Sequence, residues 1–298
     1  MKSISFPCVF LALNFLPSFV SAQTPVAPRV ASPAVEWMVE ISHAAKSDIA
    51  EGTRPLGEIS TFQSRASFLR TITSDAQSSW LLGGSWQRLE FSPAAGTPIP
   101  DSLSALALKI GYNRQLSPQW SLRTEIDPGI YSDFEDISAD DLNAPLGVRA
   151  VYAASRELQW IFGLNLDWRS GNPVVGGAGV RWQFAPDWTL LFLIPAPRIE
   201  YVATPDLTFF AGANLRGGTF RVAKDFGRSR GRPLLDDQNI GYRELSAGAG
   251  ARWKLSPAIA LSAGAGWMFD RRFEFDDRDL LLNGDGALSF QLTLSGSF

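Results

Sequence analysis

Charged residues in this sequence alternate with apolar residues in segments that have the two-residue period of a β-strand. In 119–131, for example, Trp120 and Leu122 share one row while Arg123 and Glu125 share the other. The polar rows of all such segments supply these candidates: Lys109, Arg123, Glu125, Asp127, Arg149, Asp167, Arg181, Arg198, Glu200, Glu244, Arg252 and Lys254. Because a charge facing hydrocarbon is costly, we expect these side chains to line an interior. Their mixed sign leaves two roles open, a water-filled channel with a transverse field or an interior closed by ion pairs.

Nucleophilic catalysis would depend on His43, the one histidine in the chain, which follows Ser42. On a strand these neighbours face opposite sides, so they cannot form a nucleophile and base pair with each other. A hydrolase would need a serine from another strand. An interfacial histidine without a catalytic role is the simpler interpretation, and we expect no enzyme activity and no catalytic residue.

Glycine-rich segments such as Gly177–Val180 and Gly248–Ala251 superficially look like phosphate-binding loops. A dinucleotide fingerprint requires a strand, a turn and a helix, and no helical pattern follows these segments. We interpret the glycines as interior positions that make room for bulky neighbours. Acidic clusters in 133–141 and 274–279 lack the ligand spacing of a calcium loop, so no metal or other cofactor is expected.

The N-terminal segment has the features of a secretory signal peptide. Lys2 precedes an apolar run that ends at Val20-Ser21-Ala22, and Cys8, the one cysteine, lies within that run. We therefore expect a signal peptide over 1–22, a Pro/Ala-rich periplasmic lead over 23–34, and one domain over 35–298. The net charge of −3 gives no indication of nucleic-acid binding.

The elements that must position the charged rows are predicted to be strands throughout. Our best tally is fourteen: 35–47, 58–70, 79–91, 103–116, 119–131, 146–155, 158–168, 174–184, 188–194, 198–203, 207–222, 240–255, 258–270 and 285–298. Two of them, 188–194 and 198–203, are short for a spanning strand, which leaves twelve as the competing number. Four Pro-containing turns, at Pro118, Pro186, Pro205 and Pro257, fall on one side of this arrangement, and the longer polar connections fall on the other.

The last strand, 285–298, alternates cleanly and ends in Phe298. It resembles the closing strand of bacterial outer-membrane β-barrels, in which the final Phe is part of the signal read by the barrel-assembly machinery. The chain as a whole resembles small and mid-sized outer-membrane barrels, including families of unknown function. The resemblance implies an all-β fold, a closed antiparallel up-and-down transmembrane β-barrel of about 12 to 14 strands in the outer membrane.

Three functions follow as expectations. The first is a passive, porin-like channel for small polar solutes, which has outer-membrane lipid and the assembly machinery as its other partners. The second is a non-conducting structural or surface-interaction barrel that works through its loops. The third is an outer-leaflet hydrolase that depends on His43. The sequence does not decide the solute or the oligomeric state.

Overall fold

The computed structural model describes residues 35–298, so the expected signal peptide and periplasmic lead lie outside the described residues. Its β segments, which form one sheet, are β1 Val35–Glu51, β2 Arg54–Thr73, β3 Ser78–Phe91, β4 Ser102–Gln115, β5 Trp120–Ile126, β6 Gly129–Ser132, β7 Leu142–Asn143, β8 Leu146–Ala153, β9 Leu158–Leu166, β10 Val174–Ala185, β11 Trp188–Phe192, β12 Arg198–Val202, β13 Leu207–Arg221, β14 Asn239–Ser256, β15 Ile259–Phe275, β16 Leu280–Gly284 and β17 Ala287–Ser297. The helical turns are η1 Ala139–Asp141, α1 Phe226–Ser229, η2 Pro233–Leu235 and η3 Asp276–Arg278. Within 35–298 no helix has the length and apolar character needed to cross a membrane.

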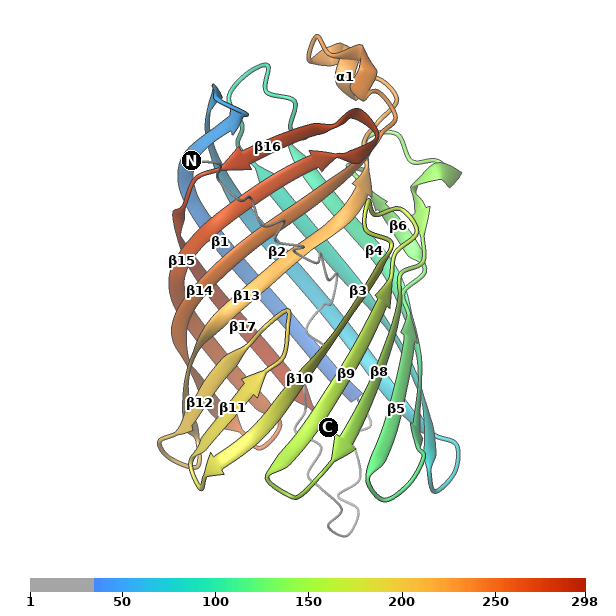
Figure 1. The fold of residues 1–298 in the computed structure, drawn as a ribbon, viewed down its shortest axis with the longest axis vertical. Helices are drawn as coiled ribbons and strands as arrows, with labels where there is room; N and C mark the ends of the chain where they lie inside the picture. The colour runs from blue at the N-terminus through green and yellow to red at the C-terminus, as the bar shows by residue number, and fades with distance from the viewer. Residues whose placement is uncertain (1–34) are drawn as a thin grey trace, which may run out of the picture.

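The sheet closes into a barrel because β1 pairs antiparallel with both β2 and β17 (Figure 1). Six of the segments combine into three spans: β5 with β6, β7 with β8, and β16 with β17. Pro128 interrupts the first of these and Pro145 the second, since proline cannot donate to a strand ladder. Counting each combined span once gives fourteen strands. The expected closed antiparallel barrel is thus confirmed with fourteen strands rather than twelve, including the two short ones, β11 and β12.

The alternation in sequence becomes an outer apolar face. Leu106 and Leu108 of β4 are 52% and 62% exposed, whereas Lys109, the residue after Leu108 and therefore on the opposite face of the strand, is 5% exposed. Near the short turns, the outward aromatic rings contact one another, as Trp120 does with Tyr152 and Trp188 with Tyr201. A belt of indole and phenol rings is typical of the headgroup level of a membrane.

The two ends of the barrel differ. At the short-turn end lie the tight connections that contain Pro118, Pro186, Pro205 and Pro257, while the helical turns lie at the opposite, long-loop end (Figure 1). The polar connection that we expected over 270–284 is mostly strand, because β15 continues to Phe275 and β16 begins at Leu280. Its alternation persists there with Phe273, Phe275 and Leu282 facing inward, fully buried.

The inward side chains at the long-loop end form an apolar core. This long-loop core comprises Ile49, Ile59, Leu89, Phe91, Ile99, Leu103, Ala105, Phe220, Val222, Ala223, Phe226, Leu235, Ile240, Tyr242, Phe273, Phe275 and Leu282. Phe91 contacts the rings of both Tyr242 and Phe273, so side chains from different parts of the wall meet in the interior. Phe226 and Leu235 come from the loop of α1 and η2, which lies beyond the strand ends and packs onto this core (Figure 1); we call this loop the lid.

Candidate interior site and wall opening

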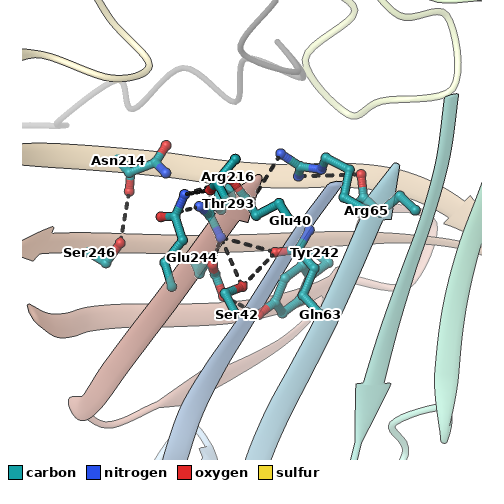
Figure 2. Close-up of polar contacts among 12 residues, drawn as sticks. Glu40, Ser42, Gln63, Arg65, Asn214, Arg216, Tyr242, Glu244, Ser246 and Thr293 are labelled. Atoms are coloured by element: carbon teal, nitrogen blue, oxygen red, sulfur yellow. Dashed lines mark hydrogen bonds and ion pairs between the residues drawn. The ribbon is translucent and has the colours of Figure 1, made fainter. Parts of the chain in front are cut away.

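A buried polar network crosses the lumen on the short-turn side of the long-loop core (Figure 2). Arg216 of β13 is at its centre. Its Nη2 lies 3.0 Å from Oε1 of Glu40 and donates to Oε1 of Gln291 at 2.7 Å. Its Nη1 donates to Ser42 Oγ at 3.0 Å and to Gln63 Oε1 at 3.3 Å. We call Glu40, Ser42, Gln63, Arg216 and Gln291 the crossbar.

Strand register explains why the crossbar forms. Ser42 of β1 lies directly opposite Gln63 of β2 on one side and opposite Gln291 of β17 on the other. Glu40 lies two residues earlier on β1 and therefore points to the same face. Its Oε2 accepts hydrogen bonds from Gln291 at 2.6 Å and from Thr293 at 3.2 Å.

Two further charged side chains extend the crossbar toward the long-loop core. Nη1 of Arg65 lies 3.9 Å from Glu40 Oε1, and Glu244 Oε1 lies 4.0 Å from Arg216 Nη1. Glu244 also accepts a hydrogen bond of 2.7 Å from the hydroxyl of Tyr242, a member of the long-loop core. Two carboxylates and two guanidinium groups thus balance each other in a region that side chains shield from solvent.

The strand ladder of the barrel wall is interrupted between β10 and β13. Among residues 35–298, the pairing of β10 with β11 reaches no further than Val180, and the pairing of β13 with β12 reaches no further than Gly212. Beyond these points no ladder joins the two strands within residues 35–298 (Figure 1). We call this region the window. Its far end is closed where Arg221 of β13 bridges to Ser132 of β6.

The loop 193–197, which joins β11 to β12, covers the part of the window that is nearer the short-turn end. It bonds to β13, because Ala213 N donates to Pro197 O at 2.9 Å and Leu215 N donates to Pro195 O at 2.8 Å. The facing edge of β10, over 174–179, pairs with no strand on this side in the described part of the chain. An unpaired backbone edge at membrane depth is tolerated only where it is buried in protein or lines a water-filled cavity, so the N–H and C=O groups of this edge require one of these two surroundings.

A cavity of about 340 Å³ lies inside the barrel and reaches this window. On the window side, its lining includes Gly176, Ala178, Ile194 and Ala213. On the opposite side all five crossbar residues line it. The cavity therefore joins the polar centre of the lumen to the window.

Glycines give the cavity its width. A Cβ built on Gly163 or on Gly177 would meet no atom within 4 Å, so both positions face open space. On the opposite strands, the ring of Phe210 takes the space over Gly250 and Gly264, where built Cβ atoms would lie 2.5 Å and 3.7 Å from its Cζ. The expected role of these glycines, to make room for a bulky neighbour, describes Phe210.

Two arginines at the edge of this cavity share one acid. Nη2 of Arg198 and Nη2 of Arg252 lie 2.7 Å and 2.8 Å from the same atom, Oε1 of Glu200. Both arginines line the cavity. Arg181 of β10 is in the same register row as Leu191 and Arg198, so it belongs to the same part of the inner wall.

The remaining predicted positions fall into two groups. Lys109 binds Glu125 Oε1 at 2.8 Å and Asp127 Oδ2 at 2.7 Å, and Arg123 also pairs with Glu125. Arg149 lines the cavity with Arg198, Glu244 and Arg252. Two positions lie near the barrel ends instead. Asp167 accepts from Asn143 Nδ2 at 2.9 Å beside β7, and exposed Lys254 donates to Pro205 O at 3.0 Å near a short turn.

His43 and Ser42 face opposite sides of β1, as expected for neighbours on a strand. Ser42 belongs to the crossbar, whereas His43 is exposed on the outer row with Val39 and Ile41.

The acidic loop residues bind backbone groups of other loops: Asp133 Oδ2 accepts from Ala223 N at 2.7 Å, and Asp276 Oδ2 accepts from Gly171 N at 3.0 Å. Residues 35–298 hold no group of three or more acidic, histidine or cysteine side chains placed to bind a metal ion. Phe298, the expected assembly signal, is 69% exposed.

Our sequence analysis missed the crossbar. Apart from Gln291, the residues of the crossbar lie on strands whose alternation of polar and apolar residues is irregular. In 35–47 the alternation ends before Lys46 and Ser47, and in 207–222 glycines interrupt it. The two-residue alternation of the strand alone predicts that the Glu40 side chain faces inward, because Glu40 lies between Val39 and Ile41, which face outward. No sequence signal indicates that Arg216 of a strand distant in the sheet would meet it.

Comparison with known proteins agrees with this architecture. A sequence model for a family described as "Domain of unknown function (DUF6268)" matches residues 71–282. No curated protein sequence gives a significant match. The COG4313 outer membrane channel from Pseudomonas putida F1 has a similar structure, with a TM-score of 0.53 at 9% identity over 93% of this chain and 98% of that chain.

Two further structures match with lower TM-scores. A Pseudomonas aeruginosa FadL homologue has a TM-score of 0.46 at 12% identity, over 90% of this chain and 93% of that chain. The Pseudomonas putida toluene transporter TodX has a TM-score of 0.46 at 9% identity, over 90% of each chain. At these identities the comparison concerns the fold alone, which is a β-barrel similar in structure to an outer membrane channel.

Proposed function

Since this chain belongs to the DUF6268 family, whose description assigns no activity, we propose from its geometry that it is a passive channel for small solutes whose route passes through the barrel wall. The short-turn end faces the periplasm and the long-loop end faces outward. A solute moves between the periplasmic part of the lumen and the window through the cavity beside the crossbar.

The single observation that carries this proposal is the cavity that touches both the crossbar and the window edge. The straight route along the barrel axis is occupied by the long-loop core and by the lid residues Phe226 and Leu235. The sequence left a channel and an ion-paired interior as alternatives, and the proposal combines them: the crossbar narrows the lumen, and the window supplies the exit.

The backbone edge of β10 supports a hydrated exit. Water or a polar solute must satisfy the N–H and C=O groups of 174–179 that face the window, because lipid chains cannot. The lining combines these polar groups with Leu191, Ile194 and Phe210. Small solutes that have both a polar group and an apolar part suit such a lining better than fully polar solutes do.

Planar-bilayer recording with single engineered cysteines tests the route. Residues 35–298 contain no native cysteine, so Gly177→Cys places the one reactive thiol of this domain in the cavity. We expect small conductance steps in refolded protein and their block after a charged thiol reagent is added to Gly177→Cys. Leu108→Cys, on the lipid-facing side of β4, is the matched control and should stay unblocked.

Two results would contradict the proposal. The first is a silent bilayer from protein whose folding is verified by its heat-dependent gel migration, which would favour a non-conducting barrel. The second is conductance that the thiol reagent leaves unchanged in Gly177→Cys, which would place the ion path elsewhere.

A further inference from the structure

We propose that the cavity selects small organic anions, with a carboxylate or a similar acidic group bound by Arg198 and Arg252 and an apolar body against Leu191 and Phe210. This inference rests on the proposed function only in treating the cavity as the place where the solute passes. The evidence for the ligand's charge is independent of conduction.

The first step is the charge balance around the cavity. Its charged lining consists of two acids, Glu40 and Glu244, and four arginines, Arg149, Arg198, Arg216 and Arg252. Both acids interact with Arg216, at 3.0 Å and 4.0 Å. The excess of positive charge therefore belongs to the other end of the cavity, where Arg198 and Arg252 divide the single carboxylate of Glu200 between them.

The second step is the supply of hydrogen-bond donors. Each guanidinium carries five N–H donors, and the contacts to Glu200 use one nitrogen of Arg198 and one of Arg252. A ligand with two acceptor oxygens matches the planar fork of a guanidinium. Glu200 keeps the two arginines close together, because their mutual repulsion would otherwise separate them.

The third step is a buried donor at the other side of the cavity. Gln63 is 3% exposed and lines the cavity, and within residues 35–298 its Nε2 has no hydrogen-bond partner, although its Oε1 accepts from Arg216. A buried N–H group without a partner costs free energy, and because this atom has almost no accessible surface, a ligand would reach it only if the Gln63 side chain turned toward the cavity. The accessible preference for an acceptor-rich, anionic ligand therefore comes from the spare N–H donors of Arg198 and Arg252.

The apolar part of the lining gives the shape of the ligand. Leu191 lies directly opposite Arg198 in the register of β11 and β12, and it is 6% exposed. Phe210 lies opposite Glu200 in β13 and covers Gly250. The carboxylate-binding arginines therefore adjoin an apolar surface, and a cavity of about 340 Å³ is at the small end of the range for ligand sites.

Isothermal titration of the detergent-solubilised, folded chain tests the inference with three probes of nearly equal shape: benzoate, benzamide and benzylammonium. We expect benzoate to bind and the neutral and cationic probes to bind at least about tenfold more weakly, the ratio expected when one charge-assisted hydrogen bond is lost. The double variant Arg198→Gln, Arg252→Gln should lose the preference for benzoate. Arg198→Lys, which keeps the charge, should retain part of it.

Arg88→Gln is the control, since Arg88 pairs with Glu90 at the exposed rim and does not line the cavity. Equal binding of all three probes would overturn the inference, as would unchanged benzoate binding in the double variant. These failures are separable from failure of the channel. Conductance without charge preference contradicts the anion site alone, whereas benzoate binding by a protein that does not conduct contradicts the proposed function alone.

Discussion

Arg216 of β13 reaches Glu40 of β1 across the lumen, with Nη2 3.0 Å from Oε1, although β14, β15 and β17 separate the two strands in the sheet. Both side chains are buried, at 8% and 3% exposure. A contact between strands that are not neighbours cannot stabilise a ladder. It fixes the cross-section of the lumen instead, and it determines where the lumen is narrow.

Removing one member of this pair should destabilise the barrel. In Arg216→Met, Glu40 keeps only the more distant guanidinium of Arg65, 3.9 Å away, as a partner of opposite charge among its described contacts. We expect a loss of about 3–5 kcal/mol in the free energy of unfolding, the usual cost of an uncompensated buried charge. Urea unfolding in detergent, followed by tryptophan fluorescence, measures it.

The double variant Glu40→Gln, Arg216→Met provides the comparison. Its loss should be smaller than the sum of the two single losses, because both single variants break the same ion pair and the two charges that remain, on Arg65 and Glu244, have opposite signs. Arg88→Gln, which breaks an exposed pair, should change the stability little. Additive losses in the double variant would show that Arg216 and Glu40 act independently.

The lid makes a second prediction. Phe226 is 1% exposed in the long-loop core, where it contacts the ring of Phe275. Phe226→Ala should detach the loop of α1 and η2 and open part of the axial route, because the remaining small side chain leaves a void that the loop cannot refill. Bilayer conductance should rise relative to the native chain. Leu234→Ala, an exposed position in the same loop, should leave conductance unchanged.

Sequence patterns predicted the wall of this barrel better than its interior. Alternation and Pro turns gave the number and the order of the strands, because each depends on neighbours within one strand or one hairpin. Arg198, Arg252 and Glu200 were likewise expected on inward rows. The crossbar and the window depend on register summed around many strands. The short strands at 188–194 and 198–203 are the one sequence sign that the wall changes there, and the same shortness also favours twelve strands over fourteen.

The lid is also attached by an ion pair that responds to pH. Arg232 donates to both carboxylate oxygens of Glu51, at 3.1 Å and 2.5 Å, at the tip of the β1–β2 hairpin beyond the membrane. These hydrogen bonds hold the pKa of the Glu51 carboxyl below its usual value. A carboxyl with a lowered folded-state pKa stabilises the attachment above its unfolded pKa, and that stabilisation is lost as pH falls through the folded value.

A fluorophore on Ser229→Cys in the lid reports this loss. Its mobility, measured by anisotropy, should increase as the pH is lowered into the acidic range where Glu51 becomes protonated. Glu51→Gln should give the mobile state already at neutral pH and remove this part of the pH dependence. A lid that stays equally immobile in Glu51→Gln would show that its apolar anchors hold it without the ion pair.

The packing of Phe210 over Gly250 makes the last prediction, which concerns the width of the cavity. A methyl group on Gly250 would clash with the backbone oxygen of Ala263 and lie 2.5 Å from Phe210 Cζ, so Gly250→Ala must displace both the neighbouring strand β15 and the ring. We expect a loss of about 1–3 kcal/mol in the free energy of unfolding, as is typical of overpacking. Gly163→Ala, which adds the same methyl group where nothing lies within 4 Å, is the matched control and should be nearly neutral. Because a displaced ring must enter the cavity, Gly250→Ala should also reduce the single-channel conductance, while Gly163→Ala should not. Equal conductance in both variants would place the solute route away from Phe210.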